Sequence, residues 1–141
     1  MMNAFDIATR ELGVMEFSGT RDNPRVLEYF TATNLHVSTD EVPWCAAFVN
    51  WALKRAGVTG TGKANARSFL DWGEPVSLVC AEQGDIVVLS RGSNEALGHV
   101  GFFHSWTSDL RGVRILGGNQ SNAVRISTYL SEHIISIRRG A

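Results

Sequence analysis

Cysteine and histidine are the residue types in this chain that can together cleave an amide bond by nucleophilic attack. The chain contains two cysteines and four histidines: Cys45, Cys80, His36, His99, His104 and His133. A thiolate attacks the carbonyl carbon of an amide, while a neighbouring imidazole takes the thiol proton and later protonates the leaving amine. Such a site requires a cysteine where a thiolate is stabilised and a histidine beside it.

Cys45 lies in the first turn of a predicted helix. The stretch P-W-C-A-A-F-V-N-W at 43–51 opens with Pro43, which is favoured at a helix start and prevents a helix from continuing upstream. Unpaired backbone N–H groups and the positive end of the helix dipole lower a cysteine pKa at this position. The same N–H groups can bind the oxyanion of a tetrahedral intermediate. The candidates for substrate or oxyanion binding are Trp44, Ala46 and Gln120.

The alternative is that Cys45 is a buried apolar residue. The predicted helix has apolar residues on most of its circumference, as expected of a central helix packed on several sides. Free cysteine is among the most buried residue types. Composition therefore favours the apolar role, whereas the position after Pro43 favours a nucleophile. Cys80 alternates within V-S-L-V-C-A, a predicted strand, and we interpret it as a core residue.

Strand geometry favours His99 as the base. His99 and His104 lie on one predicted strand and point to opposite faces, because their separation is odd. A hairpin centred on Asp109 places His99 opposite Asn119, whose amide oxygen can fix the tautomer of the ring. The same register places His104 opposite the cation Arg114, a poor setting for a base.

The alternatives for these polar residues are structural. Asn119 could be a simple turn residue in G-G-N-Q-S-N, and His99 could be a half-buried histidine of a strand with no catalytic role. His36 and His133 are predicted to be solvated surface residues. The same register places Gly101 opposite Gly117, and this pair of glycines leaves a gap through which another backbone can approach closely. The predicted catalytic set is therefore Cys45, His99 and Asn119.

The surrounding pattern predicts helices first and strands afterwards. Helices are expected over 3–13, from Pro24, over 45–57 and over 64–72 with Gly73 as a cap. Strands are expected over 85–90, 99–106, 113–119, 124–128 and 133–139. This order predicts an α+β fold in which N-terminal helices pack on an antiparallel sheet of about five strands. We expect one domain over 1–141, helical to about residue 74 and sheet from about 75.

Composition narrows the classes of partner. The formal net charge of −1 with scattered arginines gives no basic field for nucleic acid. No apolar run is long enough to span a membrane, and the N-terminus has no signal-peptide pattern, so we expect synthesis in the cytoplasm with reduced thiols. We expect no metal site: Asp40 and Glu41 lack calcium-loop spacing, and Asp85 suits a turn hydrogen bond.

The sequence resembles the small NlpC/P60- and CHAP-related cysteine peptidoglycan hydrolases, a group that includes phage-endolysin-like and bacterial proteins. The resemblance rests on E-V-P-W-C-A-A-F-V-N-W at 41–51, the segment 56–73, G-D-I-V-V-L at 84–89, G-H-V-G-F-F at 98–103 and L-G-G-N-Q-S-N at 116–122. The N-terminal segments 11–16 and 22–29 also resemble that group, so the resemblance covers nearly the whole chain.

The resemblance implies a papain-like core in which Cys45 is the nucleophile and His99 the base. NlpC/P60 proteins usually orient the base with a second histidine, whereas CHAP proteins often present Glu and Asn two residues apart. In this chain that pattern falls on Gly117 and Asn119, so the acid is absent. The calcium loop of some CHAP proteins has no counterpart here.

The function that the resemblance implies is cleavage of a peptidoglycan amide bond, within the stem peptide or between muramic acid and L-alanine, without a cofactor. The alternatives are a non-catalytic wall-binding module of the same fold, or a papain-like acyltransferase or peptidase acting on another substrate. The expected partner is peptidoglycan. Delivery to the wall in the periplasm is expected to use a phage holin, or a secretion machine with an immunity protein.

Overall fold

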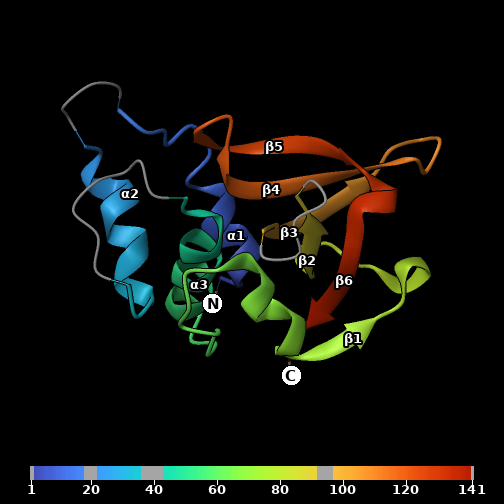
Figure 1. Ribbon diagram of the computed structural model, residues 1–141, viewed down its shortest axis with the longest axis horizontal. Helices are drawn as coiled ribbons and strands as arrows, with labels where there is room; N and C mark the ends of the chain where they lie inside the picture. Colours follow the sequence, from blue (N-terminus) through green and yellow to red (C-terminus); the bar gives the residue numbers. More distant parts are fainter. Residues whose placement is uncertain (1, 18–21, 36–42, 92–96, 141) are drawn as a thin grey trace.

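The computed structural model of the protein describes residues 2–17, 22–35, 43–91 and 97–140, and Figure 1 shows its arrangement. The helices are α1 (Ala4–Thr9), α2 (Pro24–Tyr29) and α3 (Cys45–Arg55), with 3₁₀ turns η1 (Phe30–Ala32), η2 (Ala66–Asp71), η3 (Leu78–Cys80) and η4 (Ser131–His133). The strands are β1 (Glu74–Val76), β2 (Ile86–Ser90), β3 (Gly98–Trp106), β4 (Gly112–Gln120), β5 (Ala123–Leu130) and β6 (Ile134–Arg139).

The strands form one antiparallel sheet in the order β1-β6-β2-β3-β4-β5. The predicted α+β class is therefore confirmed, with six strands rather than about five. The additional strand is β1, an edge strand that contains Pro75 and pairs with β6. Proline has no backbone N–H to donate, which restricts it to sheet edges and makes such a strand hard to recognise in a sequence.

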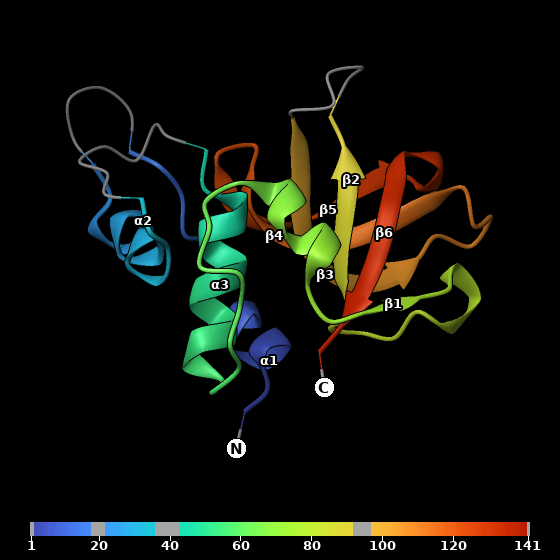
Figure 2. The same cartoon turned by 60° about the horizontal axis from the view of Figure 1, so that its bottom comes forward.

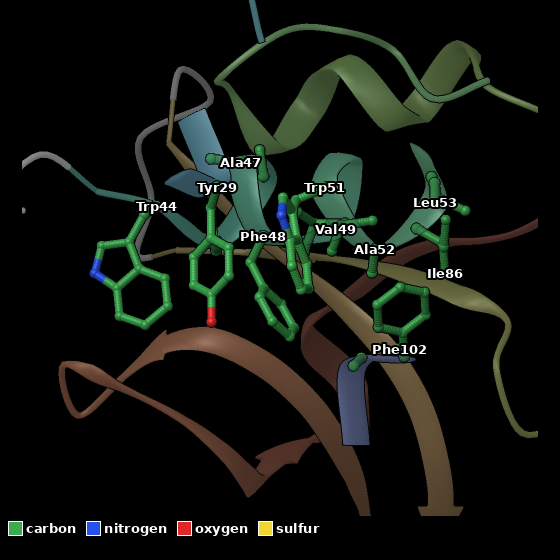
Figure 3. Packing of buried hydrophobic residues seen from close by; sticks show 14 of the residues in the cluster. Tyr29, Trp44, Ala47, Phe48, Val49, Trp51, Ala52, Leu53, Ile86 and Phe102 are labelled. Atoms are coloured by element: carbon green, nitrogen blue, oxygen red, sulfur yellow. The ribbon is translucent and has the colours of Figure 1, made fainter. Parts of the chain in front are cut away.

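α3 is the central helix, as its apolar circumference predicts. Every residue from Cys45 to Leu53 is buried, and α3 lies between α2 and the sheet in both Figure 1 and Figure 2. Beside its first two turns the rings of Tyr29, Trp44, Phe48 and Trp51 pack together (Figure 3), with centroids 4.9 to 6.4 Å apart. Burying each such side chain contributes about 1.5–3 kcal/mol, so this packing holds the first turn of α3 in place.

The predicted hairpin register is confirmed over part of its length. Phe102 pairs with Leu116 and Phe103 with Ile115, as a turn centred on Asp109 requires. An irregularity at His104 then shifts the pairing by one residue, so that Ser105 rather than His104 lies opposite Arg114. His104 instead bonds to the Ser105 hydroxyl, at 2.8 Å.

Two local predictions were wrong. The segment predicted as an α-helix over 64–72 forms the 3₁₀ turn η2, in which N–H groups bond three residues back, and Gly73 follows with φ of 62°. Cys80 is exposed in η3 and is not a core residue. The alternation around Cys80 did not reflect burial, since the neighbouring Val79 is 94% exposed. His36, Asp40 and Glu41 lie outside the described residues.

An alanine at position 118 is expected to destabilise the fold by about 1–3 kcal/mol through overpacking. A Cβ at Gly118 would lie 2.7 to 2.8 Å from ring carbons of Trp44 and from the Cβ of Phe48. Urea denaturation of Gly118→Ala measures the loss, with the exposed Ser121→Ala as control. An unchanged unfolding midpoint would show that the start of α3 can move away from β4.

Candidate active site

Cys45 is the first residue of α3, and its side chain lies among groups that stabilise a thiolate. Burial raises the pKa of this thiol, and a hydrogen bond to His99 together with the charge of that ring opposes this effect. The backbone N–H groups of Val100 and Ala46 also bond to the sulfur, so the pKa of Cys45 is lowered. The Ala46 N–H belongs to the first helical turn, as the sequence predicts. The Val100 N–H is available because regular β3–β4 pairing begins only at Phe102.

His99 lies near the start of β3, opposite Leu89 of β2, and only 7% of its surface is exposed. Burial opposes a charge on the imidazole, whereas the hydrogen bond and charge of Cys45 favour one. A further hydrogen bond to Gln120 acts in the same direction, and the pKa of His99 is raised. The lowered thiol pKa and raised imidazole pKa both favour a thiolate–imidazolium pair.

Gln120 is the residue that holds the His99 ring in its orientation. Its Oε1 lies 2.8 Å from His99 Nε2, and its side-chain N–H groups donate to the carbonyl oxygens of Ile115 and Arg125, at 3.1 and 2.7 Å. These two donations fix which end of the amide faces His99. Because Oε1 can only accept, Nε2 carries a proton, which leaves Nδ1 to take the proton of Cys45.

The structure therefore corrects the predicted contact between His99 and Asn119. Asn119 has a left-handed φ of 58° and forms a bulge, so that Gly117 pairs with Arg125 but Gln120, rather than Asn119, pairs with Ala123. The extra residue reverses the alternation of side chains. Gln120 takes the face that the hairpin prediction assigned to Asn119. Among the described residues, no hydrogen bond joins Asn119 to His99.

The side chain of Gln120 folds back over Gly117. A Cβ at Gly117 would lie 2.7 Å from Gln120 Oε1 and 3.5 Å from His99 Nε2. The space above Gly117, where the CHAP pattern would place a glutamate, is thus filled by the Gln120 carboxamide. The His99 ring is therefore contacted by a neutral acceptor from position 120, and position 117 carries no acid.

Trp44 has a structural position. It precedes α3, is fully buried, stacks on Tyr29 and donates its indole N–H to Glu16 Oε1 at 2.7 Å. A buried indole offers no surface to a substrate, so the prediction of Trp44 as a binding residue is not supported by its position. Ala46 contributes through its backbone N–H, since its side chain is also fully buried.

Tyr129 is a site residue that the sequence reasoning missed. Its hydroxyl oxygen lies 3.2 Å from His99 Nε2 and the two rings are 5.2 Å apart. Burial and then the charge of Cys45 raise the pKa of Tyr129 to about 12. Tyr129 pairs with Val113. Val113 lies two residues from Ile115 and therefore on the face of the sheet that carries His99. Extending the predicted strand 124–128 by one residue would have placed Tyr129 on that face.

Alkylation of Cys45 by iodoacetamide is expected to persist at pH values where an ordinary thiol, with a pKa of about 8.5, is protonated. The rate should fall only as pH drops through the lowered pKa of Cys45, because only the thiolate reacts. Rates measured against pH in a Cys80→Ala background isolate this thiol. In the same background His99→Gln should move the profile to higher pH, and a profile that follows an ordinary thiol would contradict the ion pair.

The described residues contain no group of three or more His, Cys, Asp or Glu side chains that could hold a metal ion. Asp85 is used structurally, since it accepts from Glu82 N–H and pairs with Arg139 through both carboxylate oxygens. Within the same described ranges, no helix is long and apolar enough to cross a membrane.

Comparison with known proteins identifies relatives of this fold. The sequence model of the CHAP domain family matches residues 37–119 of this chain. The P60 domain of an antigen from Mycobacterium avium paratuberculosis is 12% identical with a TM-score of 0.59, over 98% of this chain and 93% of that one. RipB of Mycobacterium tuberculosis, described as a peptidoglycan hydrolase, is 15% identical with a TM-score of 0.61, over 96% of this chain and 62% of RipB.

RipD of Mycobacterium tuberculosis is a third similar structure, at 12% identity and a TM-score of 0.58, over 99% of this chain and 98% of RipD. RipD is described as a non-catalytic NlpC/P60 domain protein adapted to peptidoglycan binding. No curated protein matches the sequence. At these identities the structural neighbours establish the shared fold, which is the one predicted from the sequence.

Proposed function

Because the chain belongs to the CHAP domain family, we propose that it is a cysteine hydrolase that cleaves an amide bond of peptidoglycan. The observation that supports this proposal is the continuous series of hydrogen bonds from Cys45 to His99 to Gln120 at the start of a buried helix. A cysteine that served only as an apolar residue would need neither the imidazole nor the two N–H groups at its sulfur.

The proposed reaction proceeds in two steps. The Cys45 thiolate attacks the amide carbon, and N–H groups in the first turn of α3, Ala46 among them, stabilise the oxyanion. His99, protonated at both nitrogens, gives the Nδ1 proton to the leaving amine as the C–N bond breaks and a thioester forms. His99 then takes a proton from water, whose oxygen displaces the sulfur and releases the carboxylic acid. Gln120 accepts from Nε2 throughout.

Digestion of purified sacculi tests this proposal. Mass spectrometry of the released fragments identifies the bond: a new amine within the stem peptide denotes an endopeptidase, and release of L-alanine from muramic acid denotes an amidase. Inhibition by iodoacetamide with retained activity in a chelator is the expected pattern for cysteine catalysis. Absence of any thiol-dependent fragment would refute the proposal.

Binding of peptidoglycan without cleavage is the second candidate. Similarity to RipD favours it, as does the low exposure of Cys45, of which 5% is accessible. Co-sedimentation with sacculi that release no fragments would select this function. Cleavage of other amides but not of sacculi would select the remaining alternative, a peptidase or acyltransferase with a non-wall substrate. The holin or secretion route and an immunity partner stay predictions of the sequence.

A further inference from the structure

Arg91 directly follows β2 beside the candidate active site. The β2–β3 register pairs Leu89 with His99 and Ser90 with Gly98. Directly opposed residues in a sheet share a face, and residues two apart on one strand share it as well. Continuation of β2 by one residue therefore puts Arg91 on the face that carries Leu89 and His99. Arg91 is exposed at this edge of the site.

The charge of Arg91 acts on two side chains of the site. This charge opposes protonation of His99 and favours ionisation of Tyr129, so it lowers the pKa of each group. The other causes described above are larger, and the pKa of each group is still raised overall. His99 and Tyr129 lie 3.2 Å apart at Nε2 and the hydroxyl. A cation that influences both is close to the place where a substrate must lie to reach Cys45.

The guanidinium of Arg91 has no acceptor among the described residues. Two other arginines do have carboxylate acceptors: Arg25 bonds to Glu11 and Glu28, and Arg139 bonds to Asp85 and Glu82. An exposed guanidinium presents its N–H donors in a planar arrangement that matches the two oxygens of a carboxylate.

We propose that Arg91 binds a carboxylate of the substrate next to the scissile amide bond, so that the site selects peptides with a free acidic group. This inference rests on the proposed hydrolase function and adds its specificity. A carboxylate held at Arg91 cancels the cation that disfavours the His99 imidazolium, so binding of an acidic peptide also strengthens the thiolate–imidazolium pair. A peptide whose corresponding carboxylate is amidated gains neither effect.

Two alkylating reagents test the site without any peptidoglycan. Iodoacetate carries a carboxylate and iodoacetamide does not, so the ratio of their rates at Cys45 reports a cation beside the thiolate. In a Cys80→Ala background, Arg91→Gln is expected to lower the iodoacetate-to-iodoacetamide ratio about fivefold at low salt, and Arg91→Lys by less. The control Arg111→Gln, in the exposed β3–β4 turn, should leave the ratio unchanged. Equal ratios in the parent and Arg91→Gln would overturn the inference.

Wall peptides with free and with amidated carboxylates give the second measurement. For the free form, Arg91→Gln should raise KM about tenfold or more, whereas KM for the amidated form should match that of the parent protein. If the parent cleaves both forms and Arg91→Gln changes neither, the hydrolase proposal stands and the role of Arg91 is refuted. If the parent cleaves no wall peptide, the hydrolase proposal fails, and the rate ratio alone decides whether Arg91 captures carboxylates.

Discussion

Replacement of Cys45 by alanine is expected to reduce release of peptidoglycan fragments by about 10⁴-fold or more, since loss of a nucleophile removes the covalent route entirely. The thiolate of Cys45 is stabilised by His99 and by two backbone N–H groups, and alanine keeps none of this chemistry. Fragment release per unit time from labelled sacculi gives the ratio of rates. Thermal unfolding of the variant must accompany it, because Cys45 is buried and its neighbours are tightly packed.

Cys80→Ala is the matched control for this experiment. Cys80 is exposed in η3 and is not one of the residues of the candidate site described above. Its loss should leave the rate within about twofold of the parent, as is usual for surface substitutions. Comparable activity in a folded Cys45→Ala protein would refute nucleophilic catalysis by Cys45, and with it the hydrolase proposal.

Gln120→Leu is expected to lower kcat about 10- to 100-fold. This factor corresponds to the free energy of one hydrogen bond to a charged group. The hydrogen bond from Gln120 raises the pKa of His99 and holds its proton on Nε2. Leucine has no acceptor, so the imidazolium becomes less stable and its pKa falls. Activity requires the imidazolium as an acid, so the alkaline limb of the pH–rate profile should move to lower pH. A profile of kcat against pH measures both effects.

Asn119→Gly is the control that separates the two possible orienting residues. Glycine accepts the left-handed backbone of position 119, so the bulge and the position of Gln120 are retained. We expect near-parental kcat and an unshifted alkaline limb. Loss of activity in Asn119→Gly together with normal activity in Gln120→Leu would restore the pair that the hairpin register predicted.

Much of the scaffold could be predicted because burial and local backbone preferences point the same way. Pro24 and Pro43 mark the starts of α2 and α3, and five strands are recognisable from their β-branched and aromatic residues. The centre of the β3–β4 hairpin also follows from alternation, with Phe102 opposite Leu116. The positions of Cys45 and His99 depend only on these elements. The structure brings the two side chains together, as predicted.

The remainder depends on backbone irregularities that alternation cannot reveal. The bulge at Asn119 inserts one residue into β4, and its left-handed φ is open to asparagine in many contexts that are not bulges. A rule of strict alternation therefore selects Asn119 where the structure has Gln120. Tyr129 and Arg91 lie at or just beyond the ends of predicted strands, where sequence patterns define the boundaries least well.

The arrangement at Gly117 makes two sets of side chains in the candidate active site mutually exclusive. A glutamate at 117 and the folded-back glutamine at 120 would occupy one volume above the imidazole, since even a single Cβ at 117 approaches the glutamine oxygen to 2.7 Å. A relative can therefore carry a long side chain at one of these two positions, paired with a small or outward-facing residue at the other. We therefore expect the sizes of the residues at positions 117 and 120 to covary among relatives. These positions are three residues apart on one strand, and they reach the same side of the sheet because a single residue is inserted between them.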